Sequence, residues 1–151
     1  MSETPKNAEI LARFGHDRDN LMPILHEINN TRGFISELDM QEIACHLNIS
    51  ATDVYGTATF YSYLNTEPKG KYVVRLCKSL SCDMAGKEAV AAALEAAAGC
   101  TFGNNSNDGR FTLEYGNCMG WCDQGPAMLV NQNVHTHLTP ATAKDILSQL
   151  K

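Results

Sequence analysis

The chain has 151 residues, of which 44% are hydrophobic and 19% charged, a composition typical of a folded globular protein rather than a disordered one. Twelve Lys and Arg against seventeen Asp and Glu give a formal net charge of −5, which disfavours a non-specific binder of nucleic acid or anionic membrane. The longest apolar run, residues 89–94, is too short to span a bilayer, and residues 1–6 lack the order of a secretory signal, so we expect a cytoplasmic protein without direct membrane contact.

The first half of the chain has the apolar periodicity of amphipathic helices. Leu21, Ile24, Leu25 and Ile28 follow the i, i+3, i+4, i+7 pattern that places side chains on one helix face. Three such helices are predicted over residues 17–33, 36–48 and 50–61, after a shorter one before residue 15. Residues 1–66 are therefore expected to form a helical bundle, and residues 65–70, with a proline and a glycine, to form a linker.

After this linker the pattern changes to strands alternating with helices. Strands are predicted over residues 72–77, 111–115, 127–130 and 134–138, and helices over residues 85–98 and from residue 139 onward. The first of these two helices is expected to bury Val90, Ala93, Leu94 and Ala97. The fold class is therefore α+β, with residues 71–151 forming a small sheet covered by helices and separate from the helical bundle.

Four of the six cysteines form two closely spaced pairs at predicted strand ends. Cys77 and Cys82 form a C-x4-C pair, and Cys118 and Cys122 form a C-x3-C pair. Four thiolates suit either a tetrahedral zinc ion or an iron-sulfur cluster. The three glycines within residues 116–125 favour the cluster, because they let backbone N–H groups approach inorganic sulfides closely.

The cysteines also allow other interpretations. A structural zinc module for protein interaction is the main alternative, and buried core cysteines are a second. Neither pair has the C-x-x-C spacing of a thioredoxin-type dithiol, and the pair His135 and His137, which Rieske ligation would need, is expected at the surface. Cys45 and Cys100 are expected to be buried or partly buried thiols rather than ligands.

The two cysteine pairs carry a resemblance to a known family. Their spacing, with Gly120 inside the second pair and Pro126 beyond it, resembles the thioredoxin-like 2Fe-2S ferredoxin family, as do the segments LMPILHEINNTRGFIS, VYGTATFYSYL and CMGWCDQGPAMLVN. The resemblance implies a helical bundle at 1–66, a thioredoxin-like cluster domain at 71–151, and Cys77, Cys82, Cys118 and Cys122 as ligands of a 2Fe-2S cluster. Trp121 departs from the family pattern, which more often has a small residue there, as does Gly125, where alanine is common.

The resemblance also implies a function. Members include the small iron-sulfur subunit of the NADH-oxidising module of complex I and its counterparts in NAD-linked hydrogenases and formate dehydrogenases. The chain has no GxGxxG fingerprint and no P-loop, so we expect a non-catalytic one-electron carrier beside a flavin-containing NADH-oxidising iron-sulfur subunit and a catalytic subunit. A soluble hydrogenase, a class that includes electron-bifurcating enzymes, is the expected parent complex, with formate dehydrogenase and complex I as alternatives.

Residues 36–61 could bind either of two kinds of partner, a nucleic acid or another subunit. Their helix-turn-helix pattern is typical of DNA-binding proteins, but residues 33–68 contain no Lys or Arg to neutralise phosphates, so no nucleic-acid partner is expected. The same region is rich in aromatic residues, namely Tyr55, Phe60, Tyr61 and Tyr63. We expect these residues to dock the flavin-bearing subunit, with packing into the core as the alternative.

Overall fold

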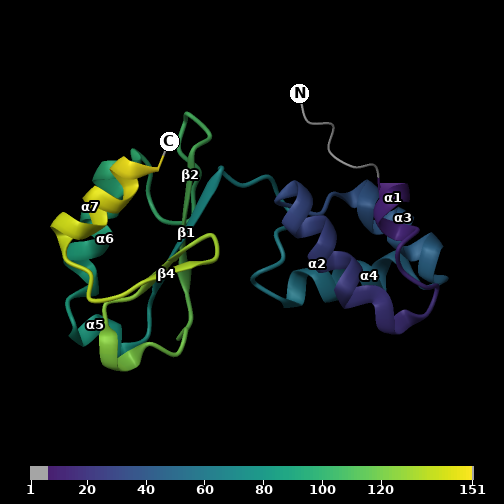
Figure 1. Ribbon diagram of the computed structural model, residues 1–151, viewed down its shortest axis with the longest axis horizontal. Coiled ribbons are helices and arrows are strands. Elements are labelled where there is room, and N and C mark those ends of the chain that lie inside the picture. The colour runs from purple at the N-terminus through teal and green to yellow at the C-terminus, as the bar shows by residue number, and fades with distance from the viewer. Residues whose placement is uncertain (1–6, 151) are drawn as a thin grey trace. The chain divides into compact units, whose positions relative to one another are not determined.

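The computed structural model describes residues 7–150, which divide into two compact units between Pro68 and Lys69. The first unit is helical (Figure 1), and its helices are α1 (Asn7–Leu11), a 3-10 turn (Arg18–Asn20), α2 (Leu21–Arg32), α3 (Glu37–Leu47) and α4 (Ala51–Phe60). The second unit contains, in chain order, β1 (Tyr72–Cys77), α5 (Leu80–Met84), α6 (Lys87–Ala98), β2 (Phe111–Gly116), a 3-10 turn (Cys122–Gln124), β3 (Met128–Val130), β4 (Asn133–His135) and α7 (Pro140–Gln149). The predicted α+β fold class is confirmed.

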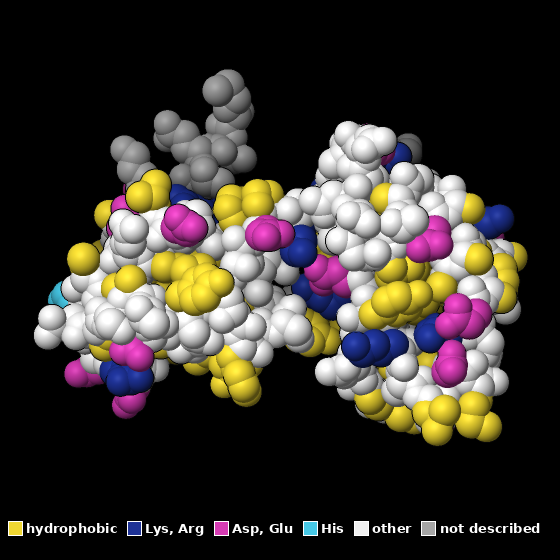
Figure 2. All heavy atoms as spheres, turned by 180° about the vertical axis from the view of Figure 1, so that it is seen from behind, with side chains coloured by type: hydrophobic (Ala, Val, Ile, Leu, Met, Phe, Trp, Pro, Cys, Tyr) yellow, Lys and Arg dark blue, Asp and Glu magenta, His cyan; other side chains and the backbone are white. Residues whose placement is uncertain are grey.

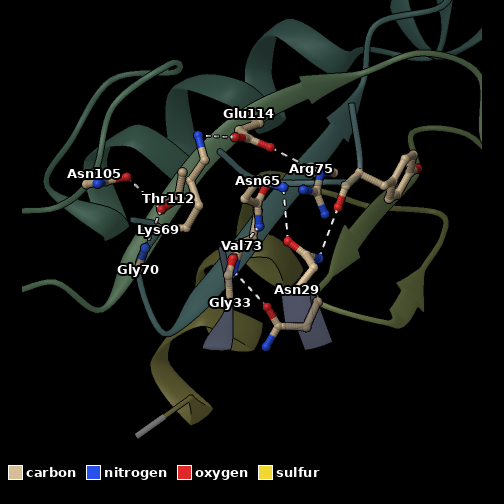
Figure 3. A network of polar contacts seen from close by, with 12 residues as sticks. Asn29, Gly33, Asn65, Lys69, Gly70, Val73, Arg75, Asn105, Thr112 and Glu114 are labelled. Atoms are coloured by element: carbon tan, nitrogen blue, oxygen red, sulfur yellow. Dashed lines mark hydrogen bonds and ion pairs between the residues drawn. The ribbon is translucent and has the colours of Figure 1, made fainter. Parts of the chain in front are cut away.

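The helical unit folds around the apolar stripes that its sequence predicts. All four apolar residues of the α2 stripe are buried in one core with residues of α1, α3 and α4. Ser36 and Asp39 form a capping box at the start of α3, which satisfies two backbone N–H groups that the helix leaves unpaired. The end of the unit is held by Asn65, whose side-chain amide donates to the Gly33 carbonyl at 2.8 Å (Figure 3).

The second unit is a four-stranded mixed sheet with two helices on one face (Figure 1). The strand order is β2-β1-β3-β4, with β1 parallel to β2 and the other two pairings antiparallel. Alternate residues of the strands, such as Val74 and Leu113, pack with Leu94 of α6 and Leu147 of α7 in one core. The sheet thus buries one face under α6 and α7, and its parallel pair, β1 and β2, ends at a common edge.

A polar network lies across the same parallel pair of strands. Glu114 of β2 forms an ion pair with Lys69 at 2.8 Å and another with Arg75 of β1 at 3.1 Å (Figure 3). Thr112 accepts a hydrogen bond from the Gly70 backbone N–H and donates one to Asn105. These contacts fix the entry of the chain into the sheet and the register of β1 against β2.

Three details of the second unit differ from the sequence prediction. The helix predicted over residues 85–98 begins at Lys87 as α6, and a short helix that was not predicted, α5, precedes it; Gly86, with a positive φ of 96°, separates the two. On α6, Ala97 is exposed, whereas Ala91 and Ala98 join the core. The last strand ends at His135 rather than at residue 138, because the backbone N–H of His137 bonds to the Gln124 carbonyl instead of to β3.

Within residues 7–150, no helix has the length and apolar character that crossing a bilayer requires.

Candidate metal centre

The parallel pairing of β1 and β2 brings the two cysteine pairs to one edge of the sheet. Cys77, the last residue of β1, stands in register with Gly116, the last residue of β2. The chain then continues from β1 into α5, which carries Cys82, and from β2 into the loop that carries Cys118 and Cys122. Helix α5 also contacts the 3-10 turn that begins at Cys122, so both loops meet beyond this edge.

The first pair is buried. Cys77 and Cys82 form a small apolar cluster with Ala127, and Met119 packs against it. The Cys77 backbone N–H donates to the Ala127 carbonyl at 3.0 Å, and the Cys82 thiol accepts from the Ala127 backbone N–H. Ala127, just before β3, therefore holds both cysteines of this pair against the sheet.

The second pair is exposed to solvent. The Cys118 and Cys122 sulfur atoms lie 3.1 Å apart, and the Gly120 backbone N–H points to the Cys118 sulfur at 3.5 Å. Gly120 has a φ of 89°, a conformation that side chains disfavour, so a glycine is needed where the loop turns its amide toward the sulfur.

The protonation of the four thiols follows this pairing. Burial raises the pKa of Cys77, but hydrogen bonds from Ser79 and from the Cys82 thiol outweigh it and leave the pKa below its ordinary value. Burial also raises the pKa of Cys82. In the exposed pair, the hydrogen bond from Cys122 lowers the pKa of Cys118, and the same contact raises the pKa of Cys122. Each pair thus contains one thiol whose pKa is lowered, and the thiolate is the form that binds a metal.

Two serines in the segment between Cys77 and Cys82 lie close to thiols of both pairs. The Ser79 hydroxyl lies 3.0 Å from the Cys77 sulfur, and its proximity also acts to lower the pKa of the Cys82 and Cys118 thiols. The Ser81 hydroxyl acts in the same direction on the pKa of the Cys122 thiol. All four thiols are therefore within reach of hydroxyl groups from the single segment that joins Cys77 to Cys82.

The backbone packs tightly beside the Cys82 thiol, and apolar residues near the cysteines in the chain are exposed. A Cβ atom at Gly125 would lie 3.3 Å from the Cys82 sulfur and 3.4 Å from the Ala85 Cβ, so the glycine allows close packing there. Trp121, between the exposed ligand candidates, is 38% exposed, and Leu80 and Met84 of α5 are also exposed. Trp121 is therefore not buried in the local core.

The remaining cysteines lie apart from this edge. Cys100 is partly buried as predicted, but the prediction for Cys45 is wrong, because its side chain points outward from α3 and is exposed. Cys45 follows the buried Ala44 by one residue, which is about 100° around a helix. Among residues 7–150, no three His, Cys, Asp or Glu side chains are placed to share a single metal ion.

The donor set nevertheless fits a binuclear cluster. Such a cluster takes four thiolates, and the edge presents two adjacent pairs rather than one ring of ligands. Cys82 lies inside α5, a helix that comes before the one predicted over residues 85–98. Sequence reasoning also missed Ser79 and Ser81, whose signal was the alternation of hydroxyls within the segment C-K-S-L-S-C.

Comparison with known proteins gives consistent matches. Residues 7–151 match the family model described as thioredoxin-like [2Fe-2S] ferredoxin. The E subunit of NADH-quinone oxidoreductase from Salmonella typhimurium (strain LT2) is 39% identical over 124 residues, which are 82% of this chain and 75% of that protein. NAD-reducing hydrogenase HoxS subunit alpha of Cupriavidus necator is 37% identical over 142 residues, which are 94% of this chain and 24% of that subunit.

A solved structure confirms the fold. In a crystal structure of an NAD+-reducing [NiFe]-hydrogenase in the H2-reduced state, one chain superposes with a TM-score of 0.78 over 89% of this chain and 22% of its own length, at 22% identity. This likeness and the family match together confirm the predicted thioredoxin-like fold. This chain thus spans roughly a quarter of the hydrogenase polypeptides that it resembles.

Proposed function

We propose, from the premise that this chain belongs to the thioredoxin-like [2Fe-2S] ferredoxin family and carries a 2Fe-2S cluster, that its two cysteine pairs bind that cluster. The proposed ligands are Cys77, Cys82, Cys118 and Cys122. The observation that carries the proposal is the convergence of both pairs beyond the common edge of β1 and β2. Residues 71–151 then act as the cluster domain and residues 1–66 as a separate helical domain.

The chemistry available at this edge is the storage of one electron. A 2Fe-2S cluster with four thiolates has a formal charge of about −2 when oxidised and −3 when reduced, and it exchanges single electrons. The chain contributes thiolates, the backbone N–H groups of Gly120 and Ala127, and the hydroxyls of Ser79 and Ser81, all of which stabilise negative charge on sulfur.

The relatives are subunits of multi-subunit oxidoreductases that use NAD(H), and this chain is a 2Fe-2S subunit of an oxidoreductase of that kind. We infer that it exchanges single electrons with a flavin-containing, NADH-oxidising iron-sulfur subunit, which itself exchanges hydride with NAD(H). A soluble cytoplasmic hydrogenase, of a class that includes electron-bifurcating enzymes, is the proposed parent complex, and the similarity to HoxS subunit alpha supports it. Complex I is supported by the similarity to the NADH-quinone oxidoreductase relative, and formate dehydrogenase remains a further alternative.

Docking of the flavin-bearing subunit is assigned to the outer face of α4. The side chains of Tyr55, Phe60, Tyr61 and Tyr63 are all exposed, Phe60 to 79%, so their packing into the core is excluded. Only Val54 and Ala58 of α4 are buried, and Asp53 is its only charged residue. A solvent-facing helix surface normally carries charged side chains, whereas exposed aromatic residues without charges are typical of the core of an interface.

Gly56 supports this assignment. An α-helix advances about 100° per residue, so Gly56 lies on the side of α4 opposite the midpoint between Val54 and Ala58, with Tyr55 and Phe60 to either side. Glycine inside a helix costs about 1 kcal/mol relative to alanine, and nothing within 4 Å of its Cβ position requires one. A partner backbone that approaches α4 closely would require it.

The occupant of this face is inferred from the hydrogenase relative. In HoxS subunit alpha, the segment similar to this chain makes up 24% of a single polypeptide. That segment is therefore covalently joined to the rest of the subunit, which is the larger part. We propose that the flavin-bearing partner corresponds to that remainder. Figure 2 shows hydrophobic side chains exposed on the surface of the molecule. Of the exposed hydrophobic residues, the docking proposal depends on Tyr55 and Phe60 of α4.

Binding of the purified flavin-bearing subunit to the full chain tests this docking. Gly56→Gln is expected to raise the Kd about tenfold or more, because the added side chain blocks close approach. Ala96→Gln places the same side chain on the exposed face of α6 and is the matched control, expected to leave the Kd unchanged. An unchanged Kd for Gly56→Gln and Phe60→Ser would move the docking site away from α4.

Metal and spectroscopic analysis of the purified chain tests the cluster itself. We expect about two iron and two sulfide per chain and an EPR signal that appears on one-electron reduction. Stoichiometric zinc in a colourless protein would instead identify the structural zinc module.

A further inference from the structure

We propose that the hydroxyl groups of Ser79 and Ser81 are hydrogen-bond donors to the sulfur ligands and raise the reduction potential of the centre. The inference rests on the proposed function, because it takes the four paired cysteines as the ligands. It assigns to two residues outside the ligand set a role in setting the affinity for the electron.

The placement of Ser79 is unusual for its position in the fold. Ser79 is the N-cap residue of α5, where a serine hydroxyl ordinarily accepts from a backbone N–H of the first turn. Here the side chain makes no such capping bond, and its oxygen lies 3.0 Å from the Cys77 sulfur. The hydroxyl is therefore committed to the sulfur atoms rather than to its own helix.

The two hydroxyls divide the four sulfur atoms between them. The Ser79 hydroxyl lies 3.0 Å from the Cys77 sulfur and is close enough to act on Cys82 and Cys118 as well, and the Ser81 hydroxyl is close enough to act on Cys122. Two residues separated by one position in the same short segment thus cover both the buried pair and the exposed pair.

Ligand binding fixes the direction of these hydrogen bonds. In a free thiol, either the sulfur or the serine oxygen can donate. A thiolate ligand has no proton, so the serine must be the donor once the cysteines are ionised.

The consequence for the potential follows from charge. Reduction adds one electron from the external reductant, no bond is broken, and the hydroxyl protons stay on oxygen. Donors to sulfur are stronger when the sulfur carries more negative charge, so they stabilise the reduced form more than the oxidised form. Removal of a donor must therefore lower the potential.

Redox titration of the full chain, followed by EPR, tests the proposal. For Ser79→Ala we expect the equilibrium constant for one-electron reduction to fall about three- to tenfold, which lowers the reduction potential by about 30 to 60 mV. For Ser81→Ala we expect a smaller fall. Ser79→Thr retains the hydroxyl and should restore the wild-type potential. Ser148→Ala is the matched control, because its hydroxyl bonds to the Asp145 carbonyl of its own helix, and it should change nothing.

A second readout is independent of whether the variants hold the cluster equally well. In the wild-type protein transferred to D2O, electron-nuclear double resonance should detect exchangeable protons coupled to the reduced centre, and Ser79→Ala should lose one of them. An unchanged potential in the double variant S79A/S81A, or no exchangeable proton attributable to Ser79, overturns the proposal. Iron content and the wild-type EPR signal are recorded first, so failure of the proposed function itself is recognised separately.

Discussion

Helices α4 and α6 have similar lengths but opposite surfaces. Helix α6 buries one face against the sheet and carries Lys87, Glu88 and Glu95 elsewhere on its surface. Helix α4 buries only two residues and turns tyrosine and phenylalanine outward. The surface of α6 is thus explained by the packing of its own unit, whereas the aromatic residues of α4 are left exposed by theirs, and we propose that they contact the flavin-bearing subunit. The cluster edge and the aromatic face accordingly lie in different units, each with a separate core.

The largest expected effect separates the two cores. Leu25 of α2 and Leu94 of α6 are both fully buried, each in its own cluster. Truncation of either to alanine should lower the free energy of unfolding by about 2 to 5 kcal/mol. We expect Leu25→Ala to shift the helical transition in circular dichroism and to spare the visible absorbance of the cluster, and Leu94→Ala to destabilise the cluster unit. If both variants moved both signals together, the two units would unfold as one.

A buried carboxylate gives the helical unit its own pH dependence. Burial raises the pKa of Asp39, but hydrogen bonds from Asn7 and Ser36 and an ion pair with Arg32 at 2.6 Å outweigh it and hold the pKa below its ordinary value of 3.8. The stability that Asp39 provides is therefore fully present above this value and is lost as the pH falls through the lower pKa of the folded state.

Replacement of this carboxylate should remove that dependence. Asp39→Asn should cost about 1 to 3 kcal/mol at pH 7, because it removes the charge that Arg32 and the capping box use. Thermal melts between pH 7 and pH 2 measure the difference between wild type and variant. The difference in stability between wild type and variant should become smaller toward pH 2. A difference that stays constant over this pH range would contradict the role of the Asp39 charge.

The smallest expected effect concerns Trp121 at the cluster edge. Because this side chain is 38% exposed, Trp121→Ala should cost less than the roughly 3 to 5 kcal/mol lost with a fully buried tryptophan. We expect the ring, which lies between Cys118 and Cys122 in the chain, to shield a negatively charged centre from water, so its removal should raise the reduction potential. EPR-monitored redox titration and thermal melts of the same variant separate the two quantities. An unchanged potential with a large loss of stability would exclude the shielding role.

Sequence reasoning found the elements whose signals are local. The capping box at Ser36 and the strand over residues 72–77 follow from neighbouring residues, and the structure has both. It found the ligand candidates because cysteine pairs at strand ends are rare by chance. The short helix α5 was missed, because five residues are too few to show a helical period.

Other features depend on contacts that spacing does not encode. The outward side chain of Cys45 depends on the rotation of α3 about its axis, which the packing of the whole helical unit decides. The hydroxyl of Ser79 reaches Cys118 only because β1 and β2 run parallel and end in register. A sequence pattern predicts parallel strands less reliably than it predicts the strands themselves, so this contact could not be anticipated.

The most direct test of the ligand assignment is iron and sulfide analysis of six single Cys→Ser variants of the full chain. We predict that the variants at Cys77, Cys82, Cys118 and Cys122 lose the cluster or hold it in a strongly altered form, because each removes a thiolate from one of the two pairs. Cys45→Ser and Cys100→Ser are internal controls, and both should retain about two iron per chain with the wild-type EPR signal. A normal cluster in any of the first four variants, or its loss in either control, would contradict the assignment of these cysteines as the ligands.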